Sequence, residues 1–301
     1  RSIALGTGPE FDLIRRFLDG AGALPPGVTV GPGDDCAVVE GAALAVSTDL
    51  SVEDVHFRRA WLAPEEIGYR AAAAALSDLA AVAARPVGVL VSLAAPAADA
   101  ADYAVRVMDG VHEAAQAADA ALIGGDVAAS PHGLVLDVTV VGEAPQPVLR
   151  SGARPGDELW VSGALGGAAA AVHAWTAGAE PPPAARKAFA RPRPRTREAQ
   201  WLAARGVLHA MLDLSDGLAG DAGHLAAASG VRIILFPDAI PVHPAVPDVL
   251  GGTEGALRLA LGGGEDYELC FTAPPGVVAP LAHEFETEFG TPLTRVGRVV
   301  E

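Results

Sequence analysis

Residues 71–84 read AAAAALSDLAAVAA, and Ser77 and Asp78 are the only polar residues in this run. The run is shorter than the roughly 20 apolar residues that a membrane span needs, so it predicts a helix packed inside a globular protein. A carboxylate in such a helix is unfavourable unless a hydrogen bond or a cation compensates for its burial. Asp78 is therefore hard to explain as a cap or a turn residue.

Five further stretches place carboxylates beside glycine or serine within apolar sequence. They are Gly33-Asp34-Asp35, Ser47-Thr48-Asp49, Gly124-Gly125-Asp126, Asp213-Leu214-Ser215-Asp216 and Gly264-Glu265-Asp266. One such stretch could be an ordinary turn, because aspartate and glycine are common turn residues. Six of them, nearly all at expected ends of strands and helices, favour one shared site. Hard oxygen ligands on glycine-containing loops suit Mg²⁺ bound with a polyphosphate, which indicates phosphoryl or nucleotide chemistry.

The composition argues against several classes of protein. The chain has 301 residues, 37 of them acidic and 21 basic, and a formal net charge of −16. This charge argues against a nucleic-acid or anionic-membrane partner, whereas bound metal can reverse the sign locally and admit a phosphorylated substrate. Cys36 and Cys270 are too few and too far apart for a disulfide framework or a zinc site. No basic leader with an apolar core is visible, so the expected compartment is the cytoplasm.

Alternating helix and strand patterns predict a fold of the α/β (α+β) class with two domains, at residues 1–145 and 146–301. The first should contain helices at 10–19, 64–84 and 97–118, and strands at 35–39, 43–48, 87–93, 120–123 (short and buried) and 134–141. The second should contain strands at 158–162, 210–214, 231–236, 267–272 and 294–300, and helices at 196–205, 218–229 and 277–289. Residues 179–195, rich in proline and arginine, are expected to form a surface excursion.

Common nucleotide-binding motifs are missing from the sequence. There is no G-x-x-x-x-G-K-[ST] motif, and the single lysine, Lys187, lies in the proline-rich segment 179–195. The chain is therefore not a P-loop enzyme. The phosphates of ATP would have to be held by metal ions, glycine-loop amides and arginines.

The order of the motifs resembles that of the thiamine-monophosphate kinases, a family within the aminoimidazole-ribonucleotide-synthetase-like superfamily of ATP-dependent enzymes. The resemblance extends from about residue 8 to residue 299. The motifs that carry it are Gly8-Pro9-Glu10-Phe11-Asp12, Gly33-Asp34-Asp35-Cys36, Ser47-Thr48-Asp49, Val55-His56-Phe57, Leu76-Ser77-Asp78-Leu79, Gly124-Gly125-Asp126, Arg150-Ser151-Gly152, Asp213-Leu214-Ser215-Asp216-Gly217 and Gly263-Gly264-Glu265-Asp266-Tyr267.

This resemblance implies an N-terminal sheet domain that dimerises and a C-terminal α/β domain that closes over the site, with several Mg²⁺ ions and with ATP as co-substrate. The implied reaction transfers the γ-phosphoryl of ATP to thiamine monophosphate. Metal-binding positions of the family match Asp35, Ser47, Thr48, Asp49, Asp78, Asp126, Asp213 and Asp216. ATP-contacting positions match Gly125, Asp126, Arg150 and Ser215, and positions that touch thiamine phosphate match His56 and Glu265. No nucleophile is expected, because the acceptor is a phosphate oxygen that is already anionic near neutral pH.

Two departures from the family pattern keep alternatives open. Val127-Ala128 stands where the family has threonines, and Glu53-Asp54 stands where it has Glu-Gly, which adds a carboxylate near the substrate loop. One alternative is another ATP-dependent enzyme of the superfamily, similar to aminoimidazole-ribonucleotide synthetase. The other is a catalytically idle dimer that binds ATP or metal. The histidines other than His56, among them His224 and His243, are expected to be surface or packing residues.

Overall fold

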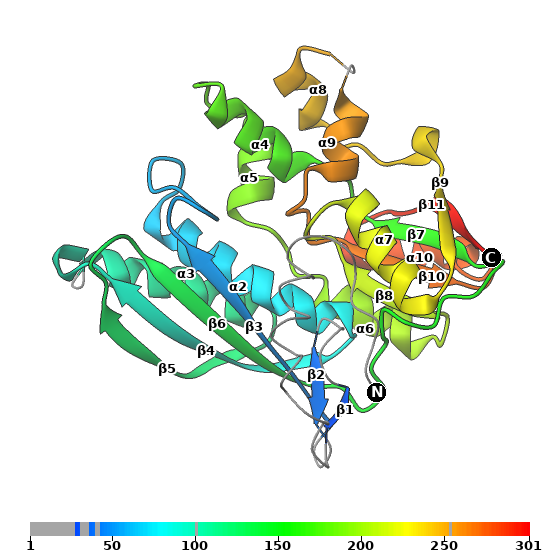
Figure 1. The fold of residues 1–301 in the computed structure, drawn as a ribbon, viewed down its shortest axis with the longest axis horizontal. Coiled ribbons are helices and arrows are strands. Elements are labelled where there is room, and N and C mark those ends of the chain that lie inside the picture. The colour runs from blue at the N-terminus through cyan, green and yellow to red at the C-terminus, as the bar shows by residue number, and fades with distance from the viewer. Residues whose placement is uncertain (1–27, 31–35, 40–42, 100–101, 253–254) are drawn as a thin grey trace.

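The computed structural model describes residues 28–30, 36–39, 43–99, 102–252 and 255–301. Within these residues the first half of the chain forms a six-stranded sheet and the second half a five-stranded sheet. Figure 1 shows the two sheets on opposite sides of the structure, with α2 reaching from the first sheet towards β8 and α6 of the second half. The expected helix at residues 10–19 and the expected ligand Asp35 lie outside the described residues.

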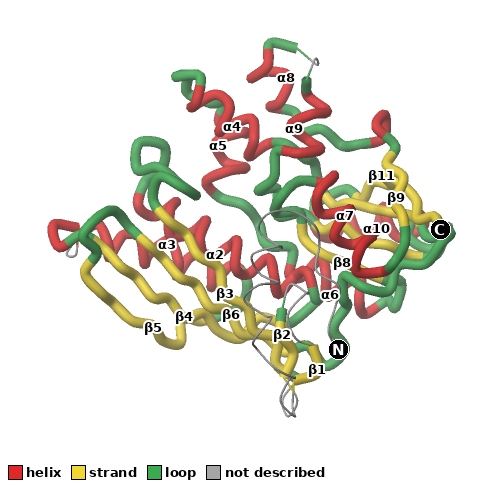
Figure 2. Tube along the Cα trace, viewed as in Figure 1, coloured by secondary structure: helices red, strands yellow, loops and turns green. Residues whose placement is uncertain are grey.

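The first sheet has the strand order β1-β2-β3-β6-β4-β5, in which the β4–β5 pair is parallel and the others are antiparallel. Its strands are β1 (Val28–Val30), β2 (Ala37–Val39), β3 (Leu44–Val52), β4 (Arg85–Ala95), β5 (Ala121–Ala129) and β6 (Val135–Glu143). Its helices are α2 (Pro64–Ala81), the short 3-10 turn η1 (Ala97–Asp99) and α3 (Asp102–Ala117). Figure 2 shows α2 and α3 together on one face of this sheet. No described helix packs on the other face, which we call the open face.

Alanine-rich composition explains how α2 becomes a central element. Its small side chains are almost entirely buried, and they let α3, the sheet and the second half of the chain approach it closely. The apolar core that it shares with the first sheet continues into α4, α5 and α8, for example at Ala170, Phe189 and Val246. The two halves therefore pack through a common core at α2.

The second sheet has the order β8-β10-β7-β11-β9, and all of its neighbouring strands are antiparallel. Its strands are β7 (Glu158–Ser162), β8 (Ala210–Asp213), β9 (Arg232–Leu235), β10 (Leu269–Ala273) and β11 (Leu293–Val300). The helices of this half are α4 (Gly167–Thr176), α5 (Pro183–Ala190), α6 (Thr196–Ala204), α7 (Leu218–Ser229), α8 (Ala245–Leu250), α9 (Ala256–Gly262) and α10 (Ala282–Phe289), with 3-10 turns η2 (Pro237–Ala239) and η3 (Ala279–Leu281). None of the helices in the described part of the chain has the length and apolar character required to cross a membrane.

Two sequence-based expectations about these elements are wrong. Residues 179–195 are not simply a surface excursion, because they contain α5, and Ala185, Phe189 and Arg195 are buried. The strand expected at 120–123 is longer than predicted, and it is exposed at nearly every position instead of buried. It is an edge strand of the sheet, so among the described residues only β4 pairs with it.

Candidate active site

Adjacent residues of β3 lie on opposite faces of the first sheet, because side chains alternate along a strand. Ser47 faces α2, where its Oγ donates a hydrogen bond of 2.5 Å to Oδ2 of Asp78. Thr48 faces the open side, and its Oγ1 donates to Oδ1 of Asp137 at 2.6 Å. Asp49 returns to the side of α2 and is partly buried. The predicted Ser47-Thr48-Asp49 motif is therefore divided between the two faces.

The polar pair inside α2 lies where the two halves of the chain meet. Ser77 is completely buried, and its Oγ donates a hydrogen bond of 2.5 Å to Oδ2 of Asp213, the last residue of β8. Its neighbour Asp78 accepts the hydrogen bond from Ser47 of β3. Consecutive residues of a helix differ in direction by about 100°, since one turn takes 3.6 residues. The pair therefore reaches two different elements and joins β3, α2 and β8.

The loop that follows β8 is held against the loop that precedes β10 by backbone hydrogen bonds. The N–H of Glu265 donates to the carbonyl of Ser215 at 2.7 Å, and the N–H of Tyr267 donates to the carbonyl of Leu214 at 2.8 Å. Gly264 permits this approach, because it has a φ of +67° and an added Cβ would lie 2.6 Å from the carbonyl oxygen of Ser215. The two predicted motifs thus form one paired-loop structure.

A cluster of potential metal ligands lies at the start of α7. Oδ2 of Asp216 is 3.8 Å from Nε2 of His224, and Asp221 accepts backbone N–H bonds from Asp216 and Gly217 at 3.1 and 3.0 Å. The ligand atoms of Asp216, Asp221 and His224 all lie within 4.8 Å of one another. Burial, together with the charges of Asp213 and Asp216, raises the pKa of Asp221 to about 8. A divalent cation would neutralise this accumulated negative potential.

A small chamber of about 60 Å³ connects Asp49 with residues expected to touch the substrate. Asp49, His56, Arg70, Glu265 and Tyr267 line it. Arg70 is buried on α2 and forms an ion pair with Glu265. Burial lowers the pKa of Arg70, and burial raises the pKa of Asp49 while the charge of His56 opposes that rise. The chamber therefore brings a predicted metal ligand and both predicted substrate residues together.

A larger cavity of about 640 Å³ opens beside the chamber and shares His56 and Glu265 with it. Nδ1 of His56 accepts a backbone N–H bond of 3.0 Å from the end of β3, so Nε2 carries the ring proton. Trp61 and Phe189 form an aromatic wall, and Trp61 stacks on Trp175 with ring centroids 5.1 Å apart. The volume suits a small organic molecule, and the wall suits a flat or cationic ring.

The open face of the first sheet carries a second polar group. Asp126 of β5 pairs in register with Ser92 of β4, which also pairs with Asp137 of β6. Asp126, Ser92 and Asp137 line a shallow cavity of about 150 Å³, and Thr48 is bonded to Asp137. Gly125 allows β5 to lie close to β4, because its φ is +155° and an added Cβ would lie 2.1 Å from a backbone oxygen of β4.

The predicted site residues therefore fall into two groups in one chain. Those on the side of α2 and at the paired loops are Ser47, Asp49, His56, Asp78, Asp213, Ser215, Asp216 and Glu265. Those on or behind the open face are Thr48, Gly125 and Asp126. Arg150 belongs with the first group, because its charge helps to lower the pKa of Asp216, after the larger effect of a hydrogen bond from His224.

Sequence reasoning missed several residues of this region. His224 was expected to be a surface or packing residue, but it lies beside Asp216, and the three-residue spacing from Asp221 to His224 on one helix face was the available signal. Arg70 and the aromatic wall had no signal of their own, because helical spacing alone cannot distinguish a core position from a cavity wall. Asp137 was likewise hidden in an alternating strand pattern.

Comparisons with known proteins agree with the fold. The family of AIR synthase related proteins matches the chain in two parts, its N-terminal domain over residues 33–144 and its C-terminal domain over residues 154–301. The chain is thus an AIR synthase related protein with both domains.

Curated relatives narrow this class. Thiamine-monophosphate kinase of Mycobacterium tuberculosis is 39% identical over 88% of this chain and 81% of its own length, and that of Escherichia coli K12 is 36% identical over 96% and 90%. The chain belongs to the thiamine-monophosphate kinase family.

Solved structures give the same result. The structure of AaThiL complexed with AMPPCP and TMP is 32% identical, has a TM-score of 0.82 and covers 98% of this chain and 91% of that one. The structure of tt0281 from Thermus thermophilus is 34% identical with a TM-score of 0.85, over 97% and 94% of the two chains. Hydrogenase maturation protein HypE, at 22% identity and a TM-score of 0.70, shares the fold.

Proposed function

We propose that this protein transfers the γ-phosphoryl group of ATP to thiamine monophosphate, giving thiamine diphosphate and ADP. The observation that carries the proposal is the convergence of Asp49, Asp78 and Asp213 at the junction of the two halves, where all three charges act on Tyr267, beside a cavity with an aromatic wall. The family members named above carry this activity in their names. We also propose that the two domains divide between residues 145 and 146 and that the protein acts in the cytoplasm.

The residues present fit Mg²⁺. Their donors are hard carboxylate and hydroxyl oxygens, which Mg²⁺ prefers, and the raised pKa of Asp221 indicates an unneutralised negative potential. We propose that Ser47, Asp49 and Asp78 hold metal on one side, and Asp213 and Asp216 on the other. Bound Mg²⁺ would screen the repulsion between the two phosphate groups and orient them for in-line transfer.

The side chains around the cavity would position the acceptor. Nε2–H of His56 is free to donate to a phosphate oxygen, because Nδ1 is occupied by the backbone of β3. Trp61 and Phe189 would contact the rings of thiamine. Arg70 holds Glu265 in an ion pair, which fixes the loop that covers the cavity. Transfer then depends on alignment and charge neutralisation, and no covalent intermediate on the protein is needed.

A single assay tests the proposal. The protein is mixed with ATP, Mg²⁺ and thiamine monophosphate, and thiamine diphosphate is followed by chromatography with a control that lacks the acceptor. Thiamine diphosphate formed in step with ADP supports the kinase reaction. ADP formed equally without the acceptor, or no product while nucleotide still binds, would contradict it and favour another acceptor or an idle relative.

Arg150 provides a separate prediction about the nucleotide. Arg150→Ala should weaken the binding of a non-hydrolysable ATP analogue by about 1–3 kcal/mol, as expected for a lost charge-assisted hydrogen bond to phosphate. Titration calorimetry measures the affinity. Arg154→Ala is the matched control, because Arg154 is an exposed arginine in the same segment between β6 and β7. Equal affinities in the two variants would remove Arg150 from the nucleotide site.

We propose that the open face pairs with the same face of a second copy. Leu50 and Ile123 are 50% and 56% exposed there, which is costly for apolar side chains in a monomer. Asp126 and Thr48 lie on this face as well, away from the carboxylates beside α2. A dimer would remove apolar surface from water and enclose the polar group of this face.

Substitution of one apolar residue tests this homodimer. Ile123→Asp should convert the protein from dimer to monomer in size-exclusion chromatography with light scattering, because a carboxylate in an apolar interface would be desolvated without a partner. Ile234→Asp is the control, since Ile234 is 41% exposed on β9, far from this sheet in the fold. A wild-type monomer, or a dimer retained by both variants, would refute the proposed interface.

A further inference from the structure

The cavity of about 640 Å³ lined by His56, Trp61 and Glu265 is called the substrate cavity below. A further cavity of about 340 Å³, which we call the second cavity, lies beside it and shares no lining residue with it. The two cavities are separated by α4, α5 and the loop before β10. Neighbouring residues of each of these segments line different cavities. Glu265 lines the substrate cavity and Asp266 the second one, and likewise Phe189 and Ala188 on α5. No residue used in the proposed reaction lines the second cavity.

The second cavity concentrates basic side chains in an acidic protein. The whole chain has 21 basic and 37 acidic residues, yet the cavity is lined by the single lysine, by three arginines and by His243, against two carboxyl groups. The basic residues are Lys187, Arg191, Arg193, Arg195 and His243, and the acidic ones are Asp266 and Glu268. Arg191 pairs with Glu113 and Arg195 pairs with Glu268 and Glu198, so Lys187 and the loosely paired Arg193 are the lining cations that remain to meet an anion.

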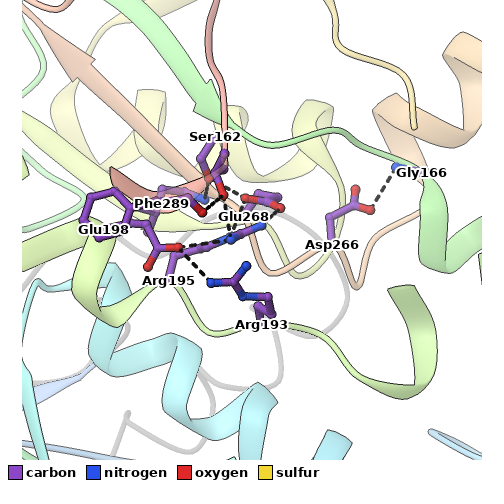
Figure 3. Close-up of polar contacts among 10 residues, drawn as sticks. Ser162, Gly166, Arg193, Arg195, Glu198, Asp266, Glu268 and Phe289 are labelled. Atoms are coloured by element: carbon purple, nitrogen blue, oxygen red, sulfur yellow. Dashed lines mark hydrogen bonds and ion pairs between the residues drawn. The ribbon is translucent and has the colours of Figure 1, made fainter. Parts of the chain in front are cut away.

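The carboxylate of Glu268 is engaged by neighbouring donors. Oε2 accepts hydrogen bonds from Oγ of Ser162 at 2.5 Å and from Nε of Arg195 at 2.8 Å, and Oε1 pairs with Nη2 of the same arginine. Arg195 also binds Glu198 and Thr291. Figure 3 shows the contacts among Ser162, Arg195, Glu198 and Glu268, with Asp266 nearby on the loop that carries Glu268. The charge of Glu268 is therefore compensated by Arg195 within this network.

Asp266 contributes a carboxyl group with an unusual environment to the wall of the cavity. Its Oδ1 accepts the backbone N–H of Gly166 at 2.8 Å, at the N-terminus of α4, while its Oδ2 is buried and has no hydrogen-bond partner. Burial raises the pKa of Asp266 to about 8. The carboxyl group is therefore mostly protonated at neutral pH and adds little negative charge to the cavity wall.

Three further side chains of the cavity can donate hydrogen bonds. Lys187 is exposed and makes no ion pair with any described residue, and Arg193 forms a long ion pair with Glu198, at 3.9 Å. Nδ1 of His243 accepts the backbone N–H of Ala245 at 3.2 Å, which leaves the proton on Nε2. Burial lowers the pKa of His243, so this ring is neutral at pH 7. Lys187, Arg193 and Nε2 of His243 are thus N–H donors at the cavity.

We infer that this cavity is a second ligand site, separate from the proposed catalytic site, and that it binds a small phosphate monoester. The phosphate would be held by Lys187 and Arg193, with His243 donating a hydrogen bond and the protonated Asp266 leaving the cavity wall without a repelling charge. Alanine and proline side chains, among them Ala164, Ala184 and Pro292, line the rest of the cavity and would accommodate the carbon part. The volume lies within the range of small-molecule sites.

Binding of two probes tests this inference. Titration calorimetry with glycerol 3-phosphate and with inorganic phosphate separates an ester site from a site for free phosphate. The wild type should bind the ester saturably, and Lys187→Gln combined with Arg193→Gln should weaken binding at least about tenfold, as expected for lost charge-assisted hydrogen bonds. Arg197→Gln is the matched control, because Arg197 is an exposed arginine on α6 outside the cavity. Tighter binding of inorganic phosphate than of the ester, identical isotherms for all three proteins, or no saturable binding would overturn the inference.

The pH dependence provides an independent test. Between pH 7 and 9 the ester remains a dianion, since its second pKa is about 6. The other charged groups that line the cavity are Lys187, Arg193 and Glu268. Acidic partners hold the pKa values of Arg191 and Arg195 above their ordinary values, and burial lowers the pKa of His243, so none of these three groups changes its charge in this range. Wild-type affinity should therefore fall as Asp266 loses its proton near pH 8 and repels the phosphate. Asp266→Asn keeps the bond to Gly166 and should make the profile flat. A flat wild-type profile would contradict the inference.

Discussion

Asp78→Asn should reduce the rate of thiamine diphosphate formation at least about a hundredfold and raise the Mg²⁺ concentration needed for half-maximal rate. The reason is the loss of an anionic ligand at the junction of β3, α2 and β8, where metal would be bound. Asparagine has nearly the same volume and can still accept the hydrogen bond from Ser47, so the fold should be retained. Steady-state kinetics at several Mg²⁺ concentrations measure both effects.

The matched control for this prediction is Asp109→Asn. Asp109 is an exposed carboxylate on α3, a helix of the same domain that lines neither the chamber nor the substrate cavity. Its variant should keep wild-type kinetics. Activity of Asp78→Asn within about twofold of the wild type, at unchanged Mg²⁺ dependence, would exclude Asp78 as a metal ligand and weaken the whole assignment of the α2 side.

Arg195→Ala should lower the free energy of unfolding by about 3–5 kcal/mol, because it leaves the buried carboxylates of Glu268 and Glu198 without their cation. Arg195 is buried and bonded to both. Burial alone would lower its pKa, but the charge of Glu268 outweighs that effect and holds the pKa above its ordinary value. Urea unfolding followed by circular dichroism measures the change.

Two further variants separate this ion-pair network from a general effect of truncation. Arg197→Ala, at an exposed site two residues away, should change the free energy of unfolding by no more than about 0.5 kcal/mol. Adding Glu268→Gln to Arg195→Ala should restore part of the lost stability, since an uncharged amide replaces the unpaired carboxylate. A loss of less than about 1 kcal/mol in Arg195→Ala alone would show that the network contributes little.

The two predictions concern different properties of the protein. Loss of Asp78 acts on chemistry at the junction of the domains, whereas loss of Arg195 acts on the support of the loop that carries Glu265, Asp266 and Glu268. We therefore expect the first variant to be stable and inactive. The second should be destabilised, with activity recovered in part under conditions that favour the folded state.

Local patterns were sufficient to predict most elements of the second half. The sequence predicts a helix over residues 218–229, and α7 has these bounds, since glycines at 217 and 230 delimit it and Gly230 adopts a left-handed conformation. The five predicted strands of that half also correspond to β7, β8, β9, β10 and β11. Burial was less predictable, as the exposed β5 and the buried Arg195 show. An edge position or a distant ion partner leaves no trace in local periodicity.

By itself, the sequence determined the chemistry that this protein can hold: six carboxylate-bearing stretches, one of them inside an apolar helix, and an order of motifs that matches a kinase family. Only the tertiary structure decided which of these groups meet. Alternation along β3 sends Ser47 and Thr48 to opposite faces, and the packing of α2 against β8 brings Ser77 to Asp213 across 136 residues of chain. Such pairings depend on side-chain direction and on long-range packing, which local sequence does not encode.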